Sequence, residues 1–219
     1  MSVHLQKPPG VLSGQMVDLV REMVRKLCTE HAARLPFHGW KHITFVETKA
    51  ADFAGYAKAD ESLVRLAALV HDLNYLSKGS GAAAGRPLRR QVLADCGVPD
   101  DVAELIEEIV LQAETQHRGT ELCAEAKALS DADTLFKVLP TTPIMFAHRF
   151  MQENEIGLRK LAGRITGDQL PLHEAGITFY LPEVRDRYEE WAVTNLRLWS
   201  AVLPALDDPD VAALMIDEL

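Results

Sequence analysis

The sequence has few cysteines and none of the patterns that cysteines form in metal-binding or secreted domains. Cys28, Cys96 and Cys123 are far apart, odd in number and without a Cys-x-x-Cys motif. This usage argues against a disulfide framework and a zinc ribbon. We therefore expect three reduced thiols in the core of a cytoplasmic protein.

Long apolar runs are also missing. No stretch approaches the roughly 20 consecutive apolar residues that a membrane-spanning helix needs, and residues 1–10 contain no apolar signal-peptide core. The formal net charge of -9 is unsuited to broad contact with nucleic-acid phosphates or anionic lipid. The sequence therefore predicts no membrane association and no nucleic-acid polymer as a partner.

A third absence is the period-two alternation of apolar and polar residues that marks half-buried strands. Apolar residues recur instead at helical spacing, between serine, aspartate, proline and glycine boundary signals. The pattern predicts helices over residues 13–35, 39–57, 60–72, 87–97, 122–139, 143–161 and 182–203, one from residue 99 and a short one after residue 209. Residues 74–86 and 163–176 are predicted as loops. An all-α fold follows, as a single domain over residues 1–219.

Several motifs of well-known enzymes are missing as well. The glycine-rich stretch at residues 79–85 lacks the spacing of a phosphate-binding loop and follows no strand, so we expect a plain loop or a flexible lid. The chain contains neither His-Glu-x-x-His nor Gly-x-Ser-x-Gly. Zincin and α/β-hydrolase chemistry are therefore not expected.

What the sequence does contain is a His71-Asp72 pair at the end of the apolar run 63–70. Burying an imidazole and a carboxylate is costly unless each has a partner, and a metal ion suits both groups. The alternative is a histidine that packs under the helix end while the aspartate faces water. The metal-site interpretation of this pair therefore depends on polar residues elsewhere in the chain.

Two histidines precede this pair. His38 and His42 are four residues apart and share a face if both are helical. Because Gly39 follows His38, that histidine falls just before the predicted helix, so His42 is the better-placed ligand. Taken alone, the two residues fit a pair of surface or hydrogen-bonded core histidines better than a pair of metal ligands.

Two carboxylates follow the pair, within an apolar helical stretch. Asp131 and Asp133 are two residues apart and point to nearly opposite sides of a helix, so only one can face a given metal ion. Both lie near buried positions, and periodicity does not choose between them. Further upstream, His117 is either a solvated loop histidine or a contact for a substrate oxyanion.

Taken in order, these residues resemble the metal site of the HD-domain superfamily of metal-dependent phosphohydrolases: they are His42, His71, Asp72, His117 and Asp133. Residues 38–46, His-Gly-Trp-Lys-His-Ile-Thr-Phe-Val, are similar to the family's His-x-x-x-His-x-x-x-Val opening. Residues 131–135, Asp-Ala-Asp-Thr-Leu, are similar to its Asp-Ala-Asp-x-Leu. In each family motif the second of the two polar residues is the ligand.

The resemblance implies an all-helical HD core over about residues 20–140, with residues 141–219 as a C-terminal helical extension. It also implies a single divalent metal ion, which would be Mn, Fe, Co, Ni, Zn or Mg. The implied ligands are His42, His71, Asp72 and Asp133. Two-metal members carry another histidine between residues that match 73 and 116, and this chain has none there. A second metal ion and di-iron oxygenase chemistry are therefore not expected.

The implied activity is hydrolysis of a small phosphomonoester or nucleotide by a metal-activated water. Asp72 is expected to orient or deprotonate that water. His117 matches a histidine that lies beside the substrate in the family, so these two residues are the catalytic candidates. The cationic residues that are candidates for substrate binding are Lys78, His117 and Arg118, with Arg89 and Arg90 as further possibilities for phosphate neutralisation.

A second interpretation is a metal-containing binding or regulatory protein without turnover. Many HD enzymes have a glycine and a lysine soon after the His-Asp pair, whereas residues 73–78 here are Leu-Asn-Tyr-Leu-Ser-Lys, and residues 141–219 carry no resemblance to a family. Metal-dependent phosphatase activity distinguishes the enzyme from the binding protein, because a binder gives no such signal.

Overall fold

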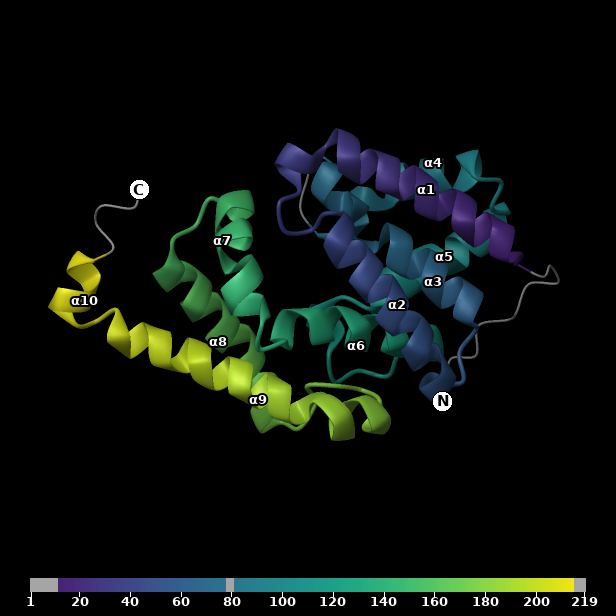
Figure 1. Cartoon of the computed structure of the whole chain (residues 1–219). Coiled ribbons are helices and arrows are strands. Elements are labelled where there is room, and N and C mark those ends of the chain that lie inside the picture. Colours follow the sequence, from purple (N-terminus) through teal and green to yellow (C-terminus); the bar gives the residue numbers. More distant parts are fainter. Residues whose placement is uncertain (1–11, 78–80, 215–219) are drawn as a thin grey trace.

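The computed structural model describes residues 12–77 and 81–214, and within these ranges the chain forms helices and no strand (Figure 1). The α-helices are α1 (Gly14–Glu30), α2 (Trp40–Ala57), α3 (Glu61–Val70), α4 (Arg86–Asp95), α5 (Asp100–Gln112), α6 (Ala124–Val138), α7 (Thr142–Asn154), α8 (Leu158–Glu174), α9 (Pro182–Ala205) and α10 (Pro209–Ala213). The predicted all-α fold is confirmed. No described helix is both long and apolar enough to cross a membrane. Residues 1–10 and Lys78 lie outside the described ranges.

The helices begin where the sequence supplies capping groups. The Ser13 hydroxyl accepts a backbone N–H in the first turn of α1, and the Asp60 carboxylate accepts two at the start of α3. Pro87 lies in the first turn of α4, where its missing N–H costs nothing. Gly97 follows α4 with a φ of 75°, which is the left-handed conformation expected of a C′ glycine.

Two boundaries in the N-terminal half differ from the prediction. α1 ends at Glu30, because the backbone of His31 departs from helical geometry, and the chain then forms the 3₁₀ turn η1 (Ala32–Arg34). The loop predicted from residue 74 begins later, because the 3₁₀ helix η2 (His71–Leu76) continues directly from α3. A second 3₁₀ turn, η3 (Ala82–Gly85), leads into α4.

The prediction for residues 143–176 was wrong in two respects. The single helix expected over residues 143–161 is interrupted, because Glu155 adopts a left-handed φ of 51° and Gly157 caps a new helix. The loop expected over residues 163–176 is mostly helical, since α8 continues to Glu174 and contains Pro171. Glycines and a proline weaken a helix, but packing against α9 outweighs this intrinsic preference.

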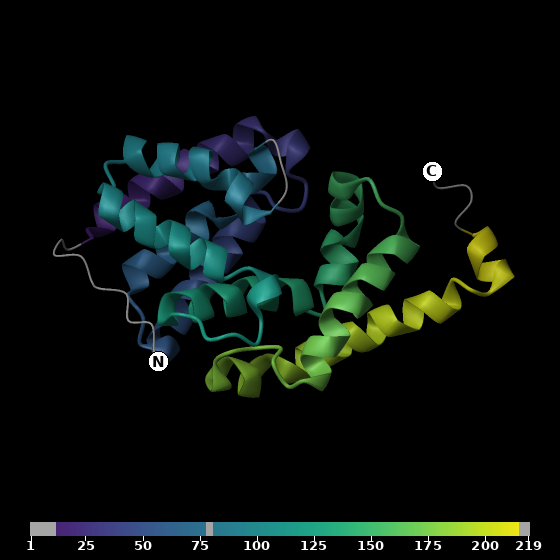
Figure 2. The same cartoon turned by 180° about the vertical axis from the view of Figure 1, so that it is seen from behind.

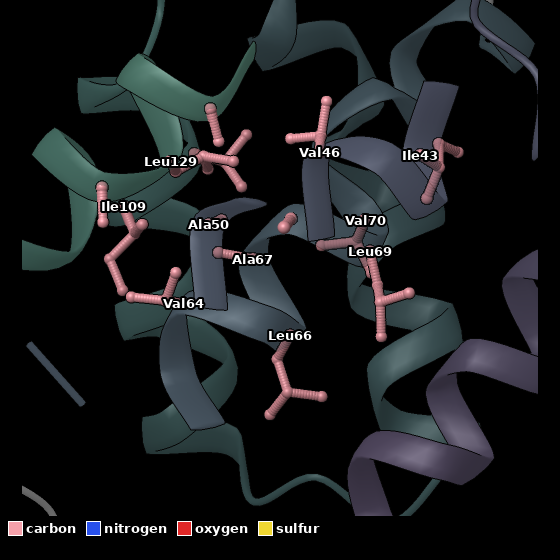
Figure 3. Packing of buried hydrophobic residues seen from close by; sticks show 14 of the residues in the cluster. Ile43, Val46, Ala50, Val64, Leu66, Ala67, Leu69, Val70, Ile109 and Leu129 are labelled. Atoms are coloured by element: carbon pink, nitrogen blue, oxygen red, sulfur yellow. The ribbon is translucent and has the colours of Figure 1, made fainter. Parts of the chain in front are cut away.

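The core is built around α3. Figure 3 shows side chains of α2, α3, α5 and α6 pointing toward one another. The labelled residues are at most 1% exposed: Ile43, Val46, Ala50, Val64, Leu66, Ala67, Leu69, Val70, Ile109 and Leu129. Burying each large aliphatic side chain contributes about 1.5–3 kcal/mol. The C-terminal end of α3 is therefore held firmly inside the bundle, and this end carries His71 and Asp72.

Helices α7 to α10 correspond to the expected C-terminal extension and project from one side of the bundle (Figures 1 and 2). Contacts at both ends show that α8 and α9 are antiparallel. Arg159 at the start of α8 contacts Asp207 just after α9, and His173 near the end of α8 contacts Glu189 in the first half of α9. A small apolar cluster of Leu161, Ala162 and Trp199 lies between them. The first half of α9 belongs to the main core and attaches the extension to α6.

A buried ion pair joins α4 to α5. The Arg89 guanidinium donates to both carboxylate oxygens of Glu107, at 2.8 and 2.7 Å, and to the carbonyl of Ala82 at 2.8 Å. The two charged side chains are 0% and 1% exposed. Arg89 is therefore a structural residue, and it is not placed to neutralise a phosphate as the sequence had suggested.

We predict that Arg89→Ala lowers the free energy of unfolding by about 3–5 kcal/mol, because Glu107 is left as an uncompensated buried charge. Arg90→Ala is the matched control, since Arg90 pairs with Asp100 and Glu104 at the surface. This change should cost less than about 1 kcal/mol. Urea denaturation followed by helical circular dichroism measures both, and equal losses would contradict the prediction.

Candidate metal centre

Three predicted ligands converge at one point in the bundle. His42 comes from the first turn of α2, whereas His71 and Asp72 come from the junction of α3 and η2. The His42 Nε2 atom lies 2.9 Å from Asp72 Oδ2 and 3.3 Å from His71 Nε2, and the His71 Nε2 to Asp72 Oδ2 distance is 3.1 Å. Together the three side chains form a group that can hold a metal ion.

The separations match those of atoms that share one metal ion. Ligand bonds of about 2.0–2.2 Å at angles near 90–110° place neighbouring donor atoms about 3–3.5 Å apart. The Asp72 Oδ2 atom is buried and makes no hydrogen bond within the described residues, although it touches both imidazoles. Burying a carboxylate oxygen in this way is costly without a further partner. Nitrogen and oxygen donors in this arrangement fit a divalent metal ion.

Both imidazoles are oriented by the surrounding protein. The His71 Nδ1 atom lies 2.7 Å from the carbonyl of Ala68, in the last turn of α3. Nδ1 therefore carries the donated proton, and the lone pair of Nε2 faces the cluster. His42 is fixed by packing instead, because its ring stacks on Phe37 and meets Phe136 edge-on.

Asp133 on α6 lies beside this cluster. Its Oδ1 atom is 3.6 Å from His42 Nε2, while its Oδ2 atom accepts a hydrogen bond from the Lys137 ammonium one turn later. Lys137 thus holds one carboxylate oxygen and leaves the other directed at the histidine. The choice between Asp131 and Asp133, which periodicity left open, is resolved in favour of Asp133 as the residue that faces the cluster.

Asp131 serves the fold. Its fully buried carboxylate accepts the guanidinium of Arg118 at 2.7 Å and the backbone N–H groups of Tyr180 and Leu181 at 2.9 and 2.8 Å. Arg118 also donates to Ser130, and its side chain is 1% exposed. The structure therefore gives Arg118 the role of joining α6 to the segment before α9, in place of the predicted substrate contact.

The structure does not bring His117 to the cluster. It ends the 3₁₀ turn η4 (Thr115–His117) and lines a separate open hollow together with Arg86 and Glu104. Its backbone carbonyl accepts the hydroxyl of Tyr180 at 2.8 Å. The geometry therefore does not support the catalytic and substrate-binding roles predicted for His117. These roles were based on the family resemblance of a single histidine.

The electrostatic environment favours the metal-binding protonation states of Asp72, Asp133 and His42, whereas at His71 the effect of burial is outweighed by the Asp72 carboxylate, which raises the pKa of that imidazole. Burial alone would raise the pKa of Asp72, but the imidazoles of His71 and His38 hold it well below the usual range. Burial likewise opposes ionisation of Asp133, yet the Lys137 ammonium lowers its pKa. Burial lowers the pKa of His42 and so favours the neutral imidazole. The cluster thus has anionic carboxylates near neutral pH.

A residue of the extension supports this site. The Glu153 carboxylate on α7 accepts the backbone N–H groups of Phe37 and His38, at 2.9 and 3.1 Å, and contacts His38 Nδ1. The His38 ring stacks on Tyr75 with 3.6 Å between ring centroids. Glu153 therefore fixes the turn that precedes α2 and His42. The sequence gave no sign of this contact, because more than a hundred residues separate its partners.

A cavity of about 240 Å³ lies between the core and the extension. Tyr75 and Lys137 line it on the side of the metal-binding group, and α8 and α9 supply most of the opposite wall. Two cationic side chains, Lys137 and Arg164, line the cavity, together with the Asp168 carboxylate, which lies 3.8 Å from the Arg164 guanidinium. Neither residue was predicted from the sequence. Lys137 shares a helix face with Asp133, which is a local signal, whereas Arg164 lies in a segment predicted as loop.

Comparison with known proteins finds solved structures whose overall fold is similar to that of this chain. No family model matches the sequence, and no curated protein is detectably similar. The structure of Bacillus subtilis YpgQ in complex with ADP superposes with a TM-score of 0.63 at 22% identity, covering 90% of this chain and 97% of that chain. A second crystal structure of Bacillus subtilis YpgQ gives a TM-score of 0.62 at 20% identity, covering 90% of this chain and 99% of that chain. At such identities the similarity establishes the fold alone.

We predict that the purified wild-type protein retains close to one equivalent of a divalent metal ion and that His71→Ala loses it. The variant removes one of three donor atoms that lie within 3.3 Å of each other. Elemental analysis after incubation with Mn, Fe or Zn measures the content. His148→Ala on the exposed surface of α7 is the control. Absence of metal from the wild type, or equal content in both variants, would contradict the prediction.

Proposed function

We propose that this chain is a metal-dependent phosphohydrolase of the HD type that acts on a small phosphomonoester or nucleotide. One observation carries the proposal: the mutual contact of His42, His71 and Asp72 within 3.3 Å, next to a cavity whose charged lining comprises Lys137, Arg164 and Asp168. A metal ion and cationic side chains are the usual means of stabilising a phosphoryl group during transfer. The ordered sequence motifs support the same assignment.

In this proposal the metal ligands are His42, His71, Asp72 and Asp133. The absence of thiolate from the set favours Mn, Fe, Co, Ni, Zn or Mg over softer ions. When bound, such an ion lowers the pKa of a coordinated water and polarises a phosphoryl oxygen. Lys137 keeps Asp133 turned toward the site, and the Ala68 carbonyl does the same for His71.

The protein side chains supply the remaining chemistry. Asp72 has one oxygen in the cluster, and its second oxygen would orient the attacking water and accept its proton. Lys137 and Arg164 would neutralise the phosphate through charge-assisted hydrogen bonds. The cavity is slightly smaller than the roughly 300–1,000 Å³ typical of drug-sized ligands, which favours a small substrate. The ADP bound to a YpgQ structure supports a phosphorylated ligand for this fold.

Asp72→Ala should abolish hydrolysis of para-nitrophenyl phosphate in the presence of Mn²⁺, while the helical circular dichroism spectrum stays close to that of the wild type. Asp52→Ala, an exposed carboxylate on α2, is the control and should retain activity. Unchanged turnover in Asp72→Ala would refute the mechanism. A wild-type protein that binds metal but hydrolyses no phosphoester would favour the binding-protein alternative.

Arg164→Ala should raise KM for phosphoesters by about 10- to 100-fold, because a charged hydrogen bond to phosphate is lost. The effect on kcat should be smaller, since the metal ligands remain in place. Lys160→Ala removes an exposed cation from the same helix and serves as the control. Steady-state kinetics distinguishes the two constants, and equal KM values for wild type and Arg164→Ala would contradict the assignment.

A further inference from the structure

Tyr75 is a residue of the cavity lining whose hydroxyl has no role in the fold. It lies in η2, three residues after Asp72, and lines the cavity on the side of the metal-binding group. Its hydroxyl makes no hydrogen bond within the described parts of the chain. Because the residue is 37% exposed, this hydroxyl is open to a ligand. A phenol offers one O–H donor to such a ligand.

The position of Tyr75 in η2 directs its side chain toward the metal-binding group. Side chains three residues apart in a 3₁₀ helix lie one above the other. Asp72 and Tyr75 have this spacing, and both belong to η2. Tyr75 therefore shares a face with the carboxylate that contacts His42 and His71.

The ring of Tyr75 is held from the extension. It stacks on the His38 imidazole with 3.6 Å between centroids and 13° between ring planes. The Glu153 carboxylate on α7 contacts Nδ1 of His38 and accepts its backbone N–H at 3.1 Å. The stack fixes the plane of the phenol, so its hydroxyl is oriented before a ligand binds.

The same aromatic cluster connects Tyr75 to both groups that are proposed to bind phosphate. The His38 ring meets the ring of His42, a metal ligand in this proposal, edge-on with 5.6 Å between centroids. It also meets Phe150 at 6.0 Å, and the Arg164 guanidinium lies 5.6 Å from the centroid of that Phe150 ring. Tyr75, Phe150 and Arg164 line one cavity. A phosphoryl group held by the metal ion and Arg164 therefore lies within reach of the Tyr75 hydroxyl.

The surrounding charges keep this hydroxyl protonated. Burial raises the pKa of Tyr75, and the carboxylates of Asp72 and Asp133 raise it further, whereas the Arg164 guanidinium has a smaller, opposite effect. The phenol is thus a neutral donor near neutral pH. The Asp168 carboxylate, 3.8 Å from Arg164, offsets part of the positive charge in the cavity. An uncharged O–H donor adds an attraction for a phosphoryl oxygen that Asp168 does not offset.

We propose that Tyr75 is a catalytic residue whose hydroxyl donates a hydrogen bond to an oxygen of the phosphoryl group, between the metal-binding group and Arg164. This inference rests on the proposed function and adds a contact to the reacting group. The phenol keeps its proton throughout. Its dipole stabilises the negative charge of the phosphoryl oxygens, in the manner of a preorganised oxyanion donor.

Tyr75→Phe removes the hydroxyl and keeps the ring that stacks on His38. With Mn²⁺ and para-nitrophenyl phosphate, kcat/KM should fall about 10- to 100-fold, the size of one lost hydrogen bond to a charged group. Metal content and the circular dichroism spectrum should stay those of the wild type. Tyr56→Phe is the matched control, since this tyrosine of α2 is 42% exposed and packs on Phe53. An unchanged kcat/KM in Tyr75→Phe would overturn the inference.

A third variant separates the hydroxyl from the ring. Because the hydroxyl has no partner in the described chain, Tyr75→Phe should leave the midpoint of urea denaturation unchanged. Tyr75→Leu also removes the stack on His38 and should lower that midpoint. If only Tyr75→Leu reduces kcat/KM, the ring acts by packing alone and the inference is wrong. A loss in Tyr75→Phe that is accompanied by an equal loss of bound metal would likewise assign a structural role.

Binding of inorganic phosphate to the Mn²⁺-loaded full-length chain gives a readout that needs no turnover. Isothermal titration calorimetry should show Kd raised about 5- to 10-fold in Tyr75→Phe. A reduced kcat/KM with an unchanged phosphate Kd also supports the inference, and it assigns the hydrogen bond to the transition state.

The two measurements distinguish failure of the contact from failure of the proposed reaction. Phosphate binding that depends on Tyr75, in a protein that hydrolyses no phosphoester, would keep the contact and reject the reaction. Hydrolysis that is unaffected in Tyr75→Phe would keep the reaction and reject the contact. A wild-type protein that neither binds phosphate nor hydrolyses phosphoesters would reject both.

Discussion

The contact of the Asp72 carboxylate with two imidazoles is the constraint on which the rest of the structure depends. The Asp72 Oδ2 atom lies 2.9 and 3.1 Å from the Nε2 atoms of His42 and His71, and burying these three polar groups is costly unless the surrounding core offsets the loss of hydration. The chain does so by burying α3 on nearly all sides, so that His71 and Asp72 leave a fixed helix end. The Ala68 carbonyl and the ring of Phe136 then fix the two imidazoles. Stability of the core and geometry of the site are therefore linked.

Sequence reasoning succeeded where the signal was local. The caps at Ser13 and Asp60, and the beginning of α2 at Trp40, follow from residue chemistry that acts within one turn. It failed over α8, where Gly163 and Gly167 indicate a loop and packing against α9 imposes a helix. Intrinsic preference amounts to about 1 kcal/mol per glycine, which a buried interface readily exceeds.

The same distinction explains what could be predicted of the site. His42, His71 and Asp72 were singled out because a buried His-Asp pair needs partners and because the order of the three residues resembles a metal-site pattern. Periodicity could not separate Asp131 from Asp133, since the decision comes from Arg118 and the segment before α9, which are distant in sequence. The substrate-binding role predicted for Arg118 was wrong for the same reason. Its guanidinium is buried against Asp131, and nothing in the sequence indicates this partner.

The part of the chain without a family resemblance is the part that closes the cavity. The metal-binding group comes from α2, α3, η2 and α6, whereas α8 and α9 supply most of the facing wall and α7 supplies Glu153. In the proposed enzyme, the reaction depends on one set of helices and the choice of substrate on another. Changes on the cavity face of α8 would then alter the ligand without moving His71 and Asp72, which are anchored by α3. Divergence of this segment is therefore compatible with retention of the ordered histidine and aspartate pattern.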